Sequence, residues 1–260
     1  MRSSGPFAMA VGQIEARPDD LVAAVGAHVR MARAAAEWGA KLVVFPELSL
    51  TGYRRSLTRA DAVAVTDPAL APLARAASQS AITIVAGAPL DSPKGLLIAG
   101  VSFQPTGDVA IYAKQHLHPG EERTFAAGEG GELLTIGGTH VGLAICAEVN
   151  HPAHVARTVA RGATVYAASA FFTPTGYDRD CRRLRGYAQR YGVPVLLANY
   201  AGASGGFESA GGSAIWDETG ELIAKAPDAR EWLVGATRSG GRWDGRTLAM
   251  TSERPRLTER

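Results

Sequence analysis

The stretch Val141-Gly142-Leu143-Ala144-Ile145-Cys146-Ala147-Glu148 decides the fold and the chemistry that we expect of this chain. Its first five residues form a small apolar run, which is typical of a buried strand and too short for an ordinary helix. The run ends on a cysteine. The sheet would hold such a thiol in place, and backbone N–H groups in the turn after it can face a developing oxyanion. A lone cysteine is more often a small buried hydrophobe, so the choice depends on the rest of the chain.

The composition is that of an ordinary soluble globular protein, with 46% hydrophobic and 20% charged residues in a chain of 260. The net charge is +2, from 27 basic and 25 acidic residues, and the arginines are spread along the chain. No strong field therefore attracts nucleic acid or a membrane surface. Two cysteines, Cys146 and Cys181, are too few for a disulfide framework, and no apolar run reaches the length of a membrane span. We expect a cytoplasmic protein.

Apolar periodicity predicts helices and strands that alternate in the outer parts of the chain, with hairpins in the middle. The predicted helices cover residues 21–38, 68–80, 152–161 and 178–191. The predicted strands cover residues 7–14, 41–45, 82–87, 96–103, 109–112, 133–136, 141–145, 164–168, 193–199, 213–216, 221–224 and 232–236. This mixture predicts α/β layers with a mixed sheet. No repeat or composition shift marks a boundary, so we predict one domain over residues 1–260, with a tail over about residues 241–260.

Three reactive side chains lie within two residues of the ends of predicted strands: Glu47, Lys114 and Cys146. In open α/β folds, sites collect at the carboxyl ends of strands. Each residue alone has an ordinary explanation, as a solvated loop carboxylate, a surface charge or a core thiol. Together they make a complete set for acyl transfer, because a thiol near its normal pKa needs a base or a cation beside it. A buried carboxylate can take its proton, and an ammonium group can stabilise an oxyanion.

Three sequence blocks around these residues resemble the signature blocks of the nitrilase superfamily of carbon–nitrogen hydrolases. The blocks are Phe45-Pro46-Glu47-Leu48-Ser49-Leu50-Thr51-Gly52-Tyr53, Tyr112-Ala113-Lys114-Gln115-His116-Leu117 and Gly142-Leu143-Ala144-Ile145-Cys146-Ala147-Glu148. The resemblance extends from about residue 7 to residue 237. It implies an α/β fold of the αββα sandwich type, a homodimer or higher homo-oligomer, and catalysis without a cofactor. A metal site is not expected, because no carboxylate or thiol matches the spacing of His151 and His154.

The resemblance also implies a role for each catalytic residue. Cys146 is the expected nucleophile, Glu47 the general base and then acid, and Lys114 the group that stabilises the tetrahedral intermediate. The backbone N–H of Ala147 is expected to complete the oxyanion site. The carboxylate of Glu148 is expected to orient the loop rather than to take part in the chemistry.

A second glutamate is implied as well, since many members of the superfamily carry one eight residues beyond the lysine. That position is Glu122 here. We expect it to position the substrate amide and to keep the nucleophile oriented. Glu121 beside it is the alternative, because an alignment can slip by one residue.

The expected substrate pocket is partly aromatic and neutral. We assign to it Tyr53, His151, Phe171, Phe172 and Phe207. Members that act on ω-amides of dicarboxylates or on carbamoyl amino acids often carry arginine four residues past the cysteine, where this chain has asparagine. This difference favours a neutral amide, although one of the two arginines directly after Tyr53 could substitute.

The sequence therefore predicts a hydrolase that cleaves a non-peptide carbon–nitrogen bond of a small linear amide or carbamoyl compound through a cysteine thioester. Ammonia or an amine would leave. One alternative is a nitrilase that hydrolyses a nitrile through a thioimidate. An alternative of another class is a catalytically silent binding protein on the same fold.

Overall fold

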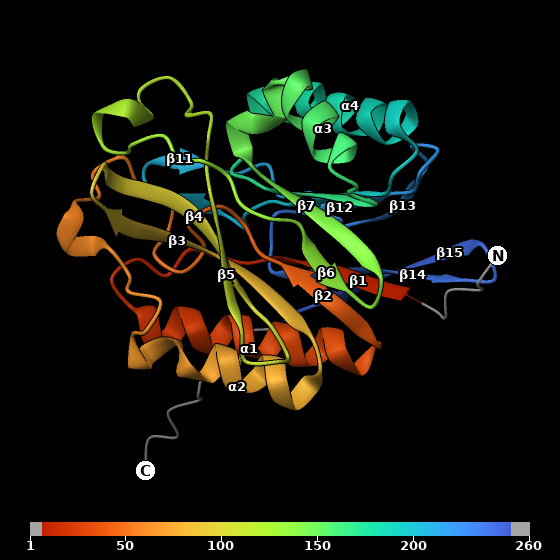
Figure 1. Ribbon diagram of the computed structural model, residues 1–260, viewed down its shortest axis with the longest axis horizontal. Helices are drawn as coiled ribbons and strands as arrows, with labels where there is room; N and C mark the ends of the chain where they lie inside the picture. The colour runs from red at the N-terminus through yellow and green to blue at the C-terminus, as the bar shows by residue number, and fades with distance from the viewer. Residues whose placement is uncertain (1–6, 251–260) are drawn as a thin grey trace, which may run out of the picture.

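Two β-sheets face each other, and a pair of helices covers the outer side of each sheet (Figure 1). The computed structural model describes residues 7–250. Helices α1 (Leu21–Glu37) and α2 (Ala71–Ser80) cover one sheet, and helices α3 (Pro152–Ala160) and α4 (Pro174–Tyr191) cover the other. This arrangement is the αββα sandwich that the resemblance to the nitrilase superfamily implies.

Both sheets are mixed, as the alternation of hairpins and helices predicts. The first has the strand order β15 (Arg242–Ala249), β14 (Trp232–Ser239), β1 (Phe7–Gln13), β2 (Ala40–Val44), β3 (Thr83–Ser92), β4 (Gly95–Phe103) and β5 (Val109–Ala113). The second has the order β13 (Leu222–Lys225), β12 (Ala214–Trp216), β9 (Val195–Ala198), β8 (Val165–Ser169), β7 (Thr139–Ile145) and β6 (Leu134–Ile136). Strands β1, β2 and β3 run parallel, as do β7, β8 and β9.

The short elements lie in the connections. They are the two-stranded ribbon β10 (Ala203–Ser204) and β11 (Phe207–Glu208), and the 3-10 helices η1 (Arg59–Asp61), η2 (Pro68–Leu70), η3 (Glu121–Arg123) and η4 (Cys146–Asn150). None of the helices in residues 7–250 combines the length and the apolar character needed to cross a lipid bilayer.

Strand β2 shows how alternate side chains enter the two cores on either side of the first sheet. Successive side chains of a strand point to opposite faces. Leu42 and Val44 lie in the core between the two sheets, whereas Val43 lies in the core under α1 and α2. All three side chains are buried, which explains why this segment is apolar without alternation.

Two sequence predictions need correction. The predicted tail begins with strand β15, which pairs with β14 from Trp232↔Ala249 to Ser239↔Arg242 around a turn at Gly240 and Gly241. Backbone pairing needs no apolar period, and the Gly-Gly dipeptide is the hairpin signal at this point of the sequence. Residues 251–260 of that prediction lie outside the described residues. Helix α4 begins at Pro174 instead of residue 178, because proline is well suited to the first helical position.

Candidate active site

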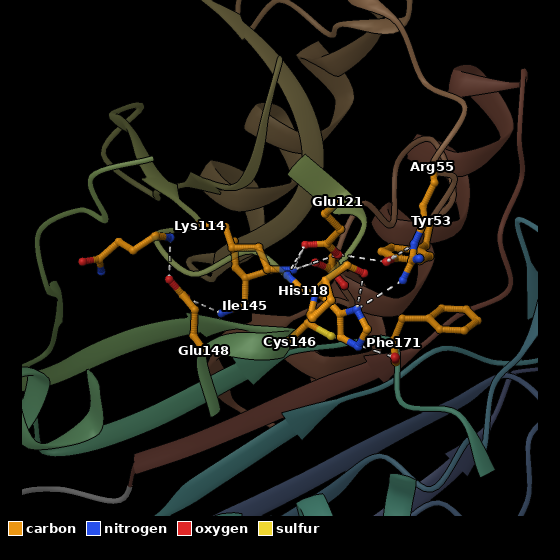
Figure 2. Close-up of polar contacts among 12 residues, drawn as sticks. Tyr53, Arg55, Lys114, His118, Glu121, Ile145, Cys146, Glu148 and Phe171 are labelled. Carbon is orange, nitrogen blue, oxygen red and sulfur yellow. Dashed lines mark hydrogen bonds and ion pairs between the residues drawn. The ribbon is translucent and has the colours of Figure 1, made fainter. Parts of the chain in front are cut away.

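The ends of strands from both sheets bring Glu47, Lys114 and Cys146 together. Figure 2 shows Lys114 and Cys146 beside Glu121. Glu47 follows β2 and Lys114 follows β5, while Cys146 follows β7 of the second sheet. The Lys114 Nζ atom lies 2.6 Å from Glu47 Oε1, and neither side chain is exposed to solvent. A buried ion pair of this kind is held only where further polar partners surround it.

The second carboxylate of the cluster belongs to Glu121. Its two oxygens lie 3.0 Å and 2.8 Å from Lys114 Nζ, and they also accept hydrogen bonds from the Tyr53 hydroxyl and the His118 N–H, both at 2.8 Å. Lys114 is therefore held between two buried carboxylates. Figure 2 shows Glu121 and Tyr53 on the same side of the lysine.

The prediction that Glu122 occupies this position is wrong. Its side chain is exposed, and its carboxylate accepts a hydrogen bond from the Gly120 N–H at 2.6 Å. Both glutamates lie in η3, where successive side chains point in different directions around the helix axis. A count of residues from Lys114 cannot decide between them, because the loop before η3 sets the phase of the turn.

Cys146 is the first residue of η4, and its backbone has a φ of +45°. A non-glycine residue in this left-handed region is strained, and such residues cluster at active sites. The first N–H groups of a helix have no partner within the helix. The N–H groups of Cys146 and Ala147, at the start of η4, therefore have no partner within this helix. The sulfur itself lies 3.9 Å from the Phe171 carbonyl oxygen.

Glu148 connects this turn to the segment that carries Lys114. Its carboxylate accepts hydrogen bonds from the Ile145 N–H at 2.7 Å, the Gln115 N–H at 2.6 Å and the Tyr112 hydroxyl at 2.9 Å. None of these bonds reaches the sulfur or the lysine ammonium. The geometry fits the orienting role that the sequence suggests for this carboxylate.

The turn that carries Glu47 is held against β3 by contacts that the sequence did not reveal. A side chain at Gly87 would meet the backbone of this turn, at 2.3 Å from the nitrogen of Leu48. The Gly87 N–H donates to Ser49 Oγ at 3.0 Å, and Ser49 Oγ lies 2.8 Å from Nε2 of the buried His28 on α1. Burial lowers the pKa of His28 to about 4, so its ring is neutral at physiological pH. These groups fix the Glu47 backbone without contact with its carboxylate.

Burial sets the protonation state of the cluster. Burial raises the pKa of Glu47 to about 7, although Lys114 opposes the shift and Glu121 adds to it. Burial and the Glu47 charge also raise the pKa of the Cys146 thiol well above its usual value, with Lys114 acting in the opposite direction. The resting thiol is therefore neutral, and an interaction with it lowers the pKa of Glu47. Glu47 Oε2 is buried and has no hydrogen-bond partner within residues 7–250, so it is free to take a proton.

Three of the predicted pocket residues form an aromatic wall beside the cluster. The rings of Tyr53 and Phe171 stack at 5.2 Å, and Phe207 meets Tyr53 edge-on at 6.4 Å. Phe207 comes from the ribbon of β10 and β11. Phe172 is buried, and its backbone N–H donates to Asn199 Oδ1 at 2.8 Å.

The prediction that His151 lines the pocket is not supported. His151 is exposed, and its ring stacks on His116 at 4.0 Å, while His154 meets His116 edge-on at 6.3 Å. His154 in turn contacts the Tyr112 hydroxyl at 2.6 Å. The histidines after the nucleophile therefore pack next to the Glu148 network instead of the aromatic wall.

Comparison with known proteins gives the class of this protein. The carbon–nitrogen hydrolase family matches residues 8–242, and the chain belongs to that family. It resembles solved structures of an amidase of the nitrilase superfamily from Nesterenkonia sp. AN1. A double mutant of that amidase in complex with acrylamide is 26% identical, with a TM-score of 0.83 over 92% of this chain and 93% of that one.

Two further mutants of the same amidase are similar to this chain. One is in complex with butyramide, with 26% identity and a TM-score of 0.82 over 92% of this chain and 93% of that one. The other shows covalent addition of the acetamide moiety of fluoroacetamide at the active-site cysteine, with 27% identity and a TM-score of 0.80 over 90% and 91% of the two chains.

Among curated proteins, this chain resembles two from Mycobacterium tuberculosis, named Hydrolase MT0498 and Hydrolase Rv0480c. Each is 34% identical over 146 residues. The match covers 52% of this chain and 51% of each relative, so the chain spans about half the length of the curated relatives that it matches.

Proposed function

We propose that this carbon–nitrogen hydrolase cleaves small linear amides through a thioester on Cys146. The observation that carries the proposal is the buried lysine held between two carboxylates beside a neutral thiol. The Cys146 thiol interacts with both Glu47 and Lys114, so the base, the cation and the nucleophile would act on one carbonyl group. The complexes of the Nesterenkonia amidase with acrylamide and butyramide support a short acyl group.

The first half of the reaction forms the thioester. Glu47 Oε2 takes the proton of the Cys146 thiol as the sulfur attacks the carbonyl carbon, so that an S–C bond forms and the carbonyl oxygen becomes an oxyanion. The Lys114 ammonium and the N–H of Ala147 stabilise this charge. Glu47 then donates its proton to the nitrogen, the C–N bond breaks, and ammonia or an amine leaves.

The second half restores the enzyme. Glu47, again a carboxylate, takes a proton from a water molecule that attacks the thioester carbonyl. The second tetrahedral intermediate uses the same oxyanion donors. When it collapses, the S–C bond breaks, the carboxylic acid is released, and the sulfur regains a proton from Glu47. Glu121 keeps the lysine ammonium in place throughout.

The proposal is tested by measuring ammonia release from a panel of short amides, carbamoyl compounds and nitriles, together with the intact mass of the protein after rapid acid quenching. We expect release from amides and a mass increase equal to the acyl group. Release from nitriles alone would favour the nitrilase alternative, in which the same residues form a thioimidate. No release from any compound, together with a thiol that resists alkylation, would favour the silent binding protein.

The pH dependence follows from the raised pKa of Glu47. Only the carboxylate form accepts the thiol proton, so kcat/KM should rise with pH through about 7 and then level off. Below that point it should fall by about tenfold per pH unit. The measurement is kcat/KM for butyramide between about pH 5 and pH 9, since this substrate does not titrate there. A midpoint near the ordinary pKa of glutamate would contradict the assignment of Glu47 as the base.

A further inference from the structure

A single arginine lies at the rim of the aromatic wall, close to the buried cluster (Figure 2). The guanidinium carbon of Arg55 is 5.4 Å from the centre of the Phe207 ring. Its Nε donates to the Tyr53 hydroxyl at 3.4 Å, and one Nη lies 3.2 Å from His118 Nδ1. Tyr53 and His118 both also bond to Glu121. The guanidinium of Arg55 is thus linked to Glu121, the carboxylate that holds Lys114, through one intervening residue on each path.

Arg55 forms no ion pair with a carboxylate in residues 7–250. Arg54 pairs with Asp19 and Arg59 pairs with Asp91, each at 3.1 Å. Within residues 7–250, no carboxylate lies within ion-pair distance of Arg55. This comparison separates the two arginines that follow Tyr53, because Arg54 is directed to Asp19 and Arg55 to the site.

The two glutamates nearest to Arg55 are engaged elsewhere. The oxygens of Glu121 accept hydrogen bonds from Lys114, Tyr53 and the His118 N–H. The carboxylate of Glu122 accepts from the Gly120 N–H. The hydrogen bond to Tyr53, with a smaller contribution from the charges of the two glutamates, raises the pKa of Arg55, so the guanidinium is cationic. At most two of its five N–H groups are engaged here, and the others are free to bind a ligand.

We propose that Arg55 binds the far end of the substrate, and that the preferred substrates are short ω-amides whose acyl chain ends in a carboxylate. This inference rests on the proposed function. With the amide carbon at Cys146, the methylene chain would lie along the rings of Tyr53 and Phe171, and the carboxylate would meet the guanidinium at the rim. A planar guanidinium recognises a carboxylate through two parallel hydrogen bonds, and a neutral amide of the same length lacks this pairing.

The test compares kcat/KM for succinamate and glutaramate with kcat/KM for butyramide and pentanamide, the neutral amides of matched chain length. We expect the wild type to prefer the anionic member of at least one pair. In Arg55→Met, the ratio of anionic to neutral kcat/KM should fall by about 10- to 100-fold, the value of a charge-assisted hydrogen bond. Arg55→Lys should restore part of the ratio, since it keeps the charge without the planar fork. Arg59→Met, which removes an exposed arginine paired with Asp91, is the matched control and should keep the ratio of the wild type.

The outcomes separate this inference from the function on which it rests. Turnover of butyramide and pentanamide with no preference for either anionic partner would overturn the carboxylate proposal and leave the amidase intact. So would an Arg55→Met protein that loses activity equally on all four amides, because a merely structural arginine would act in that way. No ammonia from any of the four compounds would overturn the proposed function itself.

Discussion

Cys146→Ala should abolish ammonia release from every amide that the wild type hydrolyses. Without the thiol no thioester forms, and the remaining groups can only polarise the carbonyl. Removal of a nucleophile that acts as a unit with its base costs on the order of 10⁶-fold in kcat. The measurement is ammonia release at high enzyme concentration, with intact mass to detect an acyl adduct in the wild type and its absence in the variant.

The second cysteine of the chain provides the control. Cys181 lies on α4, half-buried and away from the cluster, and burial raises the pKa of its thiol to about 11. Cys181→Ala should therefore keep the activity and the adduct. The fold of Cys146→Ala should survive, because the change removes one small side chain, and thermal unfolding by circular dichroism checks this. An active, folded Cys146→Ala protein would exclude the thioester mechanism.

Glu121→Gln should lower kcat/KM by about 100-fold or more, a loss comparable to the removal of one oxyanion donor. The substitution keeps the size of the side chain but removes the charge that faces Lys114 at 2.8 Å. The Lys114 ammonium would then be paired with Glu47 alone. Its position would be less firmly fixed, and the pKa of Glu47, the general base, would change. The pH profile reports this second effect, since the midpoint for Glu47 should move, whereas simple loss of folded protein would leave it in place.

Glu122→Gln is the matched variant, one residue further along the same turn. Its carboxylate is exposed, and glutamine can still accept the Gly120 N–H. We expect its kcat/KM to stay close to that of the wild type. Equal losses in the two variants would contradict the assignment of Glu121 as the second glutamate. A larger loss in Glu122→Gln would favour Glu122, the residue predicted from the sequence.

The sequence predicted the layers of this fold because its apolar periods are strong where strands and helices bury a face. The strand before Cys146 and the helix over residues 21–38 were found within a residue or two of their ends. Strand β15 was not predicted from the sequence. Its side chains are mostly exposed, and it is held by backbone hydrogen bonds, which require no apolar pattern in the sequence. The Gly240–Gly241 turn was the available signal.

For the site, the sequence determined which residues could act, and the tertiary structure decided which of them meet. Glu47, Lys114 and Cys146 follow strands, which made them candidates as a set, and the resemblance to the nitrilase superfamily gave each an expected role. The choice between Glu121 and Glu122 depends on the phase of a single 3-10 turn, and the choice between Arg54 and Arg55 depends on which partner each finds. Such choices rest on contacts between residues far apart in the chain, as when Tyr53 bonds to Glu121 across 68 positions. A linear pattern carries the identity of each partner but not their distance, and distance is what sets the charge and the chemistry of this site.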